Sequence, residues 1–227
     1  MSKNLFITGT GTDVGKTYVS ALILKKFQEN NQKAAYYKAA MSGNIRNSTG
    51  QLIPGDAEHI KKISKIKQPV DEMCSYIYES PFAPHLAAKY EGNPVDMDVI
   101  KTQFKKMQRR YDYITVEGSG GIICPIRMDN VKINLEDIVT TLNLSCIIVA
   151  DSGLGAINNV VLTTEYMKSK KIPVKGIILN NFDKSNILHG NNLFMCEHIT
   201  KIKVIACVEH NCKNIDIDID LLKSLYN

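Results

Sequence analysis

The sequence predicts an α/β fold of the phosphate-loop NTPase type, with a mostly parallel sheet covered by helices on both faces. Short apolar runs alternate with helical patterns along most of the 227 residues, which is the order of elements that produces parallel sheets. A glycine-rich segment at residues 9–17 (GTGTDVGKT) follows the first apolar run and precedes the first helical pattern. A phosphate-binding loop occupies this position between a strand and a helix.

Length and composition indicate a single globular domain over residues 1–227, with 44% hydrophobic and 22% charged residues and a net charge of +5. The lysines lack interleaved aromatic residues, so they indicate solvated helix faces and not a nucleic-acid surface. No apolar run approaches the ~20 residues of a membrane span, and the first is too short for a signal peptide. The six cysteines form no CxxC pair, which favours reduced thiols in a cytoplasmic protein.

The loop at residues 9–17 has the chemistry for binding phosphate. Its backbone N–H groups and the following helix N-terminus form a partly positive anion site. We expect Lys16 to reach the outer phosphates and the Thr17 hydroxyl to bind Mg²⁺. The loop is a variant, because the glycine usually found five residues before Gly15 lies one residue earlier, at Gly9. The expected nucleotide contacts are Gly11, Thr12, Asp13, Val14, Gly15, Lys16, Thr17 and Tyr18.

The next segments supply further polar candidates. A second strand, residues 33–38, ends in Lys38, which is either a solvated strand end or a residue of the ligand crevice. The polar, glycine-punctuated residues 44–55 predict a mobile loop. Asp56 opens a helix, where its carboxylate either accepts backbone N–H bonds as an N-cap or binds a metal. For His85, a structural role at a helix start is the simpler interpretation.

The second informative segment is residues 113–121 (YITVEGSGG). An apolar strand delivers Glu117 at its carboxyl end, and a glycine-rich turn follows. In phosphate-loop enzymes an acidic residue at this position is associated with the metal, and pointing a carboxylate inward is otherwise costly. We therefore expect Glu117 to serve the metal and nucleotide, and the turn at Gly118 to let the backbone approach a substrate closely.

The rest of the chain continues the alternation of strands and helices. Asn180 ends one of these strands, so we expect it to line the crevice and face a nucleobase. The remaining predicted elements are helices at residues 57–63, 99–110, 156–167 and 193–199, strands at 144–150, 174–179 and 203–208, and a helical tail.

Taken together, these segments resemble the dethiobiotin synthetase family. The resemblance covers residues from about Lys3 to Asn181 and implies a homodimer that uses ATP and Mg²⁺ to close the ureido ring of dethiobiotin from diaminopelargonate and CO₂ or bicarbonate. The motifs that carry it are GTGTDVGKT at 9–17, YYKAAMSG at 36–43, GDA at 55–57, APHL at 83–86, VEGSGG at 116–121 and LGAIN at 154–158.

The resemblance also implies a role for each motif. Lys16 and Lys38 would neutralise the γ-phosphate and a carbamate formed from a substrate amine and CO₂. Thr12 and Ser42 would hydrogen-bond the carbamate or the transferring group. The metal ligands would be Thr17, Asp56 and Glu117. Other substrate contacts would come from Ser42, from Gly118 and, across the dimer, from Leu154, Gly155, Ala156, Ile157 and Asn158 at a helix N-terminus.

Two departures from the family pattern leave alternatives open. The proline that often follows the lysine at Lys38 is replaced by Ala39, and a Gly-x-Ile-Pro segment that helps to bind the base is replaced by residues 206–209 (ACVE). Residues 180–183 (NNFD) resemble a guanine-reading Asn-Lys-x-Asp motif. A switch-type ATPase or GTPase of related fold, another ATP-dependent ligase and a non-catalytic nucleotide-binding partner protein are therefore the competing interpretations.

Overall fold

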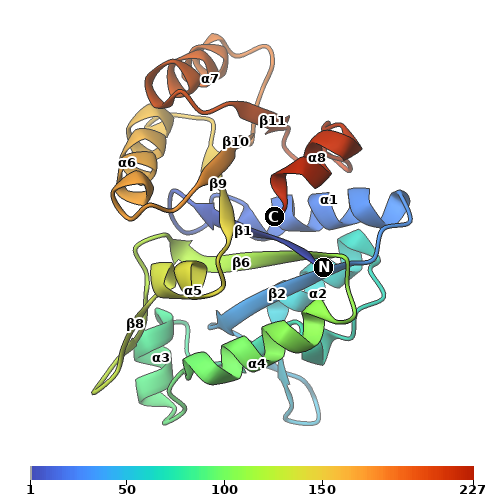
Figure 1. Cartoon of the computed structure of the whole chain (residues 1–227), viewed down its shortest axis with the longest axis vertical. Helices are drawn as coiled ribbons and strands as arrows, with labels where there is room; N and C mark the ends of the chain where they lie inside the picture. Colours follow the sequence, from blue (N-terminus) through green and yellow to red (C-terminus); the bar gives the residue numbers. More distant parts are fainter. Residues whose placement is uncertain (1) are drawn as a thin grey trace.

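In the computed structural model, which describes residues 2–227, a seven-stranded sheet forms the centre of the molecule (Figure 1). Every pairing within this sheet is parallel, which confirms the predicted fold class. The order of the strands is β11 (Val204–Val208), β10 (Val174–Asn180), β9 (Ser145–Asp151), β1 (Lys3–Gly9), β6 (Tyr113–Gly121), β2 (Ala34–Met41) and β5 (Cys74–Ile77).

Helices cover both faces of the sheet, because alternate residues of each strand point to opposite sides. In β1, Leu5 and Ile7 belong to one buried apolar cluster and Phe6 belongs to the other. The cluster around Leu5 and Ile7 contains apolar residues of α1 (Lys16–Glu29), α2 (Gly55–Ser64) and α8 (Ile219–Leu225). The cluster around Phe6 contains residues of α3 (Pro84–Tyr90), α4 (Met97–Gln108), α5 (Leu135–Thr141), α6 (Ala156–Ser169) and α7 (Ile187–Thr200).

Strand β1 lies in the middle of the sheet, between β9 and β6. After β1, the chain forms β2, β5 and β6 on one side of β1, and then β9, β10 and β11 on the other side. The strand order therefore reverses at β1. In open parallel sheets, ligands bind beyond the carboxyl ends of the strands at such a switch point. The loop that follows β1 is therefore in the position where a ligand crevice is expected.

The two ends of the chain lie side by side near the centre of the view in Figure 1. Asn4 donates its backbone N–H to the carbonyl of Asn227 at 2.7 Å. The hydroxyls of Thr115 and Tyr226 lie 2.7 Å apart, which links the end of the chain to β6. In the part of the chain that is described, no helix is long and apolar enough to cross a membrane.

Three local predictions are corrected by the structure. Residues 44–55 are not an irregular loop but carry a short antiparallel hairpin, β3 (Ile45–Arg46) with β4 (Leu52–Ile53). The buried Asn44 amide closes its base by donating to the Met41 and Tyr78 carbonyls and accepting from Gly55 N at 3.0 Å. Helix α2 begins at Gly55 with Pro54 as its N-cap, so Asp56 is not the cap. The glycines after Glu117 form no turn directly, since β6 continues through Gly121.

Several elements were not predicted. They are the edge strand β5, a one-turn 3₁₀ helix η1 (Val70–Glu72), the hairpin of β7 (Pro125–Met128) with β8 (Lys132–Asn134), and the short helix α5. Each is seven residues or shorter, too short to show a clear hydrophobic period. The predicted helices and strands of the main sheet are present with shifts of a few residues, and α7 begins six residues before its predicted start.

Candidate active site

The loop between β1 and α1 is held against strand β10 by close backbone contacts. Gly15 has a φ of +92°, and a Cβ atom at this position would lie 2.0 Å from Nδ2 of Asn180. The same Nδ2 donates a hydrogen bond to the carbonyl of Val14 at 3.1 Å. Only glycine fits both the left-handed backbone and the close approach. Asn180 therefore fixes the shape of the loop, in addition to any contact it makes with a nucleobase.

Lys16 is the first residue of α1, and its side chain lies back along the loop. The Lys16 ammonium donates to the carbonyl of Gly11 at 2.7 Å, and the residue is buried. Burial lowers the pKa of Lys16 below its ordinary value, and the nearby Glu117 carboxylate partly opposes this. A buried ammonium with one carbonyl partner gains from an anionic ligand, so the loop is suited to phosphate.

Four polar residues from four different elements meet beside this loop. Lys38 of β2 donates to Oδ2 of Asp56 at 2.6 Å and to Oε1 of Glu117 at 2.9 Å. The Thr17 hydroxyl, on α1, donates to the same Oε1 atom of Glu117 at 2.8 Å and lies 3.4 Å from Oδ1 of Asp56. Thr17 therefore lies within hydrogen-bond distance of the other two predicted metal ligands, Asp56 and Glu117, and Lys38 joins these two carboxylates.

Strand register explains the pairing of Lys38 with Glu117. The two residues stand opposite each other on the parallel strands β2 and β6, so their side chains leave the sheet on the same face. The Glu117 side chain is 0% exposed, and that of Lys38 is 9% exposed. Burial on its own would lower the pKa of Lys38, but the charges of Glu117 and Asp56 outweigh it and raise this pKa. Lys38 therefore keeps its charge, and its carboxylate partners offset the cost of burying it.

These residues line a cavity of about 640 Å³ at the carboxyl end of the sheet. Ten of the predicted site residues contribute to its wall, and they are Thr12, Asp13, Gly15, Lys16, Thr17, Tyr18, Lys38, Ser42, Asp56 and Glu117. The sequence analysis missed Gly55, His59, Ser119 and Gly120, which also line it. Ser119 and Gly120 belong to the VEGSGG motif, so extending the prediction by two residues would have found them.

Other predicted site residues lie outside this wall. Gly11 and Val14 offer their carbonyls to Lys16 and Asn180. At Gly118, a Cβ atom would come within 2.9 Å of the side chains of Leu135 and Phe6, so the structure accounts for this glycine by core packing. His85 is not among the lining residues either.

The segment at residues 154–158 lies at a separate groove beside α6 and α7. This groove is mainly apolar, and Leu154 is 89% exposed. Gly155 has a φ of +85° and caps the N-terminus of α6. Within one copy of the chain, this segment and the cavity at the phosphate loop have no lining residue in common.

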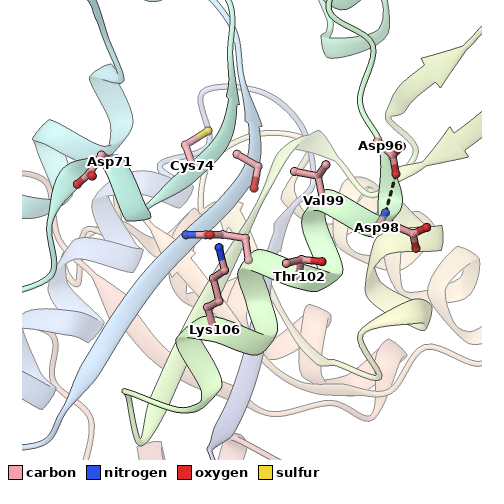
Figure 2. Close-up of a pocket in the computed structure, with 9 residues that line it drawn as sticks. Asp71, Cys74, Asp96, Asp98, Val99, Thr102 and Lys106 are labelled. Carbon is pink, nitrogen blue, oxygen red and sulfur yellow. Dashed lines mark hydrogen bonds between the residues drawn. The ribbon is translucent and has the colours of Figure 1, made fainter.

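A further cleft, of about 460 Å³, lies between the edge strand β5 and helix α4 (Figure 2). Asp96 accepts a hydrogen bond from the backbone N–H of Asp98 at 2.7 Å, which caps α4. Burial raises the pKa of the Cys74 thiol to about 12, so this thiol is protonated and unreactive at neutral pH. None of the predicted site residues lines this cleft. The cavity at the phosphate loop is therefore the candidate active site.

The polar cluster also fits a divalent cation. Residues 2–227 hold no group of three or more His, Cys, Asp and Glu side chains arranged for a metal. Thr17, Asp56 and Glu117 instead offer one hydroxyl and two carboxylates. Mg²⁺ prefers such hard oxygen ligands and takes the rest of its shell from water and substrate phosphates. Oε2 of Glu117 is buried and has no hydrogen-bond partner within the described chain.

Comparison with known proteins shows what the whole chain is similar to. The profile of a protein family described as "AAA domain" matches residues 3–215. A protein of Clostridium botulinum (strain Loch Maree / Type A3), "ATP-dependent dethiobiotin synthetase BioD", is 48% identical over 226 residues, which is 100% of this chain and 99% of that protein. A protein of Brachyspira hyodysenteriae with the same name is 48% identical over 95% of this chain and 96% of its own length.

Solved structures with low sequence identity share the fold. The MinC:MinD cell division protein complex of Aquifex aeolicus matches with a TM-score of 0.58 at 15% identity, covering 98% of this chain and 86% of that chain. A putative plasmid partition protein of Borrelia burgdorferi, bound to AMPPNP, matches with a TM-score of 0.53 at 17% identity, covering 99% of this chain and 94% of its own. These matches show the fold alone.

Proposed function

The chain belongs to the dethiobiotin synthetase family, and we propose that its phosphate-loop cavity joins diaminopelargonate and CO₂ in the ATP-dependent synthesis that defines this family. The enzyme is a ligase that uses a nucleoside triphosphate. One observation carries the assignment of the site. Lys16, Lys38, Asp56 and Glu117, which come from separate motifs, meet at one cavity beyond the carboxyl ends of β1, β2 and β6.

The proposed reaction has three steps. An amine of diaminopelargonate attacks CO₂, loses a proton and becomes a carbamate. The carbamate oxygen takes the γ-phosphoryl group of ATP, which gives a carbamic-phosphoric anhydride and ADP. The second amine attacks the carbamoyl carbon, phosphate leaves and the ureido ring closes. In such a reaction the protein mainly positions the reactants and neutralises their charge.

The two lysines are suited to this neutralisation. Lys16 follows the phosphate loop directly, so its ammonium can turn from the Gly11 carbonyl toward the outer phosphates of ATP. Lys38 stays protonated in the cavity because carboxylates surround it. We assign Lys38 to the carbamate and to the charge that develops during phosphoryl transfer. Thr12 and Ser42 line the same wall and would donate hydrogen bonds to the carbamate.

Thr17, Asp56 and Glu117 would hold Mg²⁺, which would supply positive charge to neutralise the phosphates of ATP. Their clustering around the Thr17 hydroxyl supports this assignment. The Asn180 side chain is assigned to the nucleobase. Its Nδ2 atom is used by Val14, while its Oδ1 atom is buried without a partner among residues 2–227 and could accept an N–H from a base.

The substrate carboxylate would bind at the N-terminus of α6 from a second subunit. Residues 154–158 lie away from the cavity of their own chain, so they can complete a site only across an interface. Large apolar side chains that line the groove beside α6 and α7 are exposed, namely Leu154, Leu162 and Ile199. Contiguous apolar surface of this kind marks interaction sites. A homodimer follows, and sedimentation that shows a fully active monomer would contradict it.

The assignment is tested by incubating the protein with diaminopelargonate, bicarbonate, MgCl₂ and ATP, and following dethiobiotin by mass spectrometry and ADP by chromatography. We expect one ADP for each dethiobiotin. Omission of diaminopelargonate should leave only trace ATP hydrolysis. Nucleotide hydrolysis at an undiminished rate without diaminopelargonate would favour the switch-type ATPase or GTPase interpretation of this site.

A further inference from the structure

Tyr36 is a buried tyrosine of β2 whose hydroxyl has no assigned use. It is 0% exposed and packs in the apolar cluster on the side of α1, α2 and α8. Within residues 2–227, its hydroxyl oxygen has no hydrogen-bond partner. A buried hydroxyl is expected to be paired, and an unpaired one in a native structure calls for an explanation. A phenylalanine would fill the same space without this cost.

Glu117 is a polar group in need of a partner that lies close enough to act on this hydroxyl. Its Oε2 atom is also buried and also lacks a hydrogen-bond partner in the described chain. On the adjacent strands β2 and β6, Tyr36 stands opposite Thr115, and Lys38 stands opposite Glu117. Tyr36 and Glu117 therefore project from the same face of the sheet as diagonal neighbours, a separation that aromatic and long side chains span.

The charge of Glu117 acts on this hydroxyl. Burial raises the pKa of Tyr36 well above its ordinary value, and the charges of Glu117 and Asp56 raise this pKa further. A phenol hydroxyl is a hydrogen-bond donor. It can offer a proton to a carboxylate oxygen, and it adds no charge to the site.

The backbone of Tyr36 is also fixed. The buried side chain of Gln68 accepts from the N–H of Tyr36 at 2.7 Å and donates to its carbonyl at 2.9 Å. These two bonds imitate the pairing of a neighbouring strand at a point where β5 does not yet lie beside β2. The position of the ring is therefore set by the strand and by Gln68, whether or not a ligand is bound.

We propose that Tyr36 is a positioning residue for the metal site, donating a hydrogen bond to Oε2 of Glu117 and so directing Oε1 toward Thr17 and Asp56. In the ligand-free protein, both Lys38 and Thr17 donate to Oε1. When Lys38 turns to a carbamate, Glu117 loses a donor, and Tyr36 supplies one on the opposite oxygen. Groups that orient a metal ligand in this way tune its affinity. The inference rests on the proposed function, since it takes Glu117 as a metal ligand.

The test compares Tyr36→Phe with Tyr37→Phe. Tyr37 is the next residue of the same strand, is equally buried and points to the other face, where its hydroxyl lies 2.7 Å from Oγ of Ser75. The readout is the affinity of the protein for Mn²⁺ in the presence of a non-hydrolysable ATP analogue, measured by electron paramagnetic resonance. A thermal melt of each metal-free variant accompanies it.

Tyr36→Phe should weaken Mn²⁺ binding by about tenfold or more and should not lower the melting temperature of the metal-free protein, in which the hydroxyl is unpaired. Tyr37→Phe should lower the melting temperature and leave Mn²⁺ affinity unchanged. Unchanged Mn²⁺ affinity in Tyr36→Phe, or an equal loss in both variants, would overturn the inference.

A third variant, Glu117→Gln, separates the inference from the proposed function. If it weakens Mn²⁺ binding and Tyr36→Phe does not, only the role of Tyr36 is lost. If Glu117→Gln leaves Mn²⁺ affinity unchanged, Glu117 is not a metal ligand, and both the metal assignment and the inference fail.

Discussion

Replacing Lys38 by methionine should destabilise the ligand-free protein far more than replacing an exposed lysine. The ammonium donates to Asp56 and Glu117, and the Glu117 side chain is 0% exposed. Removing one partner of a buried pair leaves an uncompensated charge and costs roughly 3–5 kcal/mol. The lower end applies, because Asp56 is 37% exposed and water can replace its lost contact. At about 2–4 °C per kcal/mol for a chain of this size, the melting temperature should fall by roughly 6–12 °C.

The assay is urea and thermal unfolding without metal or nucleotide. Lys105→Met, on the exposed face of α4, is the matched control and should be close to neutral. Adding Glu117→Gln to Lys38→Met removes the stranded charge and should recover a large part of the lost stability, which a double-mutant cycle measures. A loss below about 1 kcal/mol in Lys38→Met, the level of an exposed pair, or no recovery in the double variant would refute the reasoning. Turnover by Lys38→Met should fall by about 10²-fold or more.

The remaining predictions concern activity, base choice and pH. Lys16→Ala and Glu117→Ala should abolish ring closure, and near-normal dethiobiotin formation by either variant removes that residue from its assigned role. With residues 206–209 in place of Gly-x-Ile-Pro, GTP and CTP should be accepted with little loss. An ATP preference of order 10³ in kcat/KM, about 4 kcal/mol, would show that another segment reads adenine. Burial raises the pKa of the Cys74 thiol from 9.0 to about 12, so the folded chain keeps a proton that the unfolded chain loses. The free energy of unfolding should therefore fall as the pH rises from 9 toward 12, less steeply in Cys74→Ala, as urea titrations at several pH values can measure.

The motifs predicted the loop between β1 and α1 well because its sequence signal is local. A strand, a glycine-bearing turn and a helix that begins with Lys16 and Thr17 are all contained in residues 3–29. The hairpin at residues 44–55 was missed for the opposite reason. Its two strands are two residues each, and its base is closed by Asn44, whose partners include Tyr78, 34 positions away. A polar, glycine-containing sequence does not reveal such a contact.

We predicted a turn at Gly118 because the sequence does not give the end of a strand or the face on which a residue lies. Glycine after a strand-end carboxylate suggested a turn that admits a ligand. In the structure β6 continues, and alternation along the strand points position 118 to the core, against Phe6 and Leu135. The same alternation places Glu117 and Ser119 on the cavity side. Because β6 extends beyond Glu117, Gly118 packs against the core and Ser119 joins the residues that line the cavity.

From the sequence, we predicted a separate contact with a ligand for each of four residues, Lys16, Lys38, Asp56 and Glu117. The structure shows that Lys38 is also bonded to Asp56 and to Glu117, the latter through a register between β2 and β6 that joins residues 79 positions apart, and that the charges of both carboxylates act on Lys16. Two ammonium groups and two carboxylates compensate each other's charge while the site holds no ligand. ATP and a carbamate must then compete for the lysines, and a cation must compete for the carboxylates. When the nucleotide takes the lysines, the carboxylates become free for the cation, and when the cation takes the carboxylates, the lysines become free for the nucleotide. Nucleotide and metal should therefore bind cooperatively, and neither should bind tightly alone.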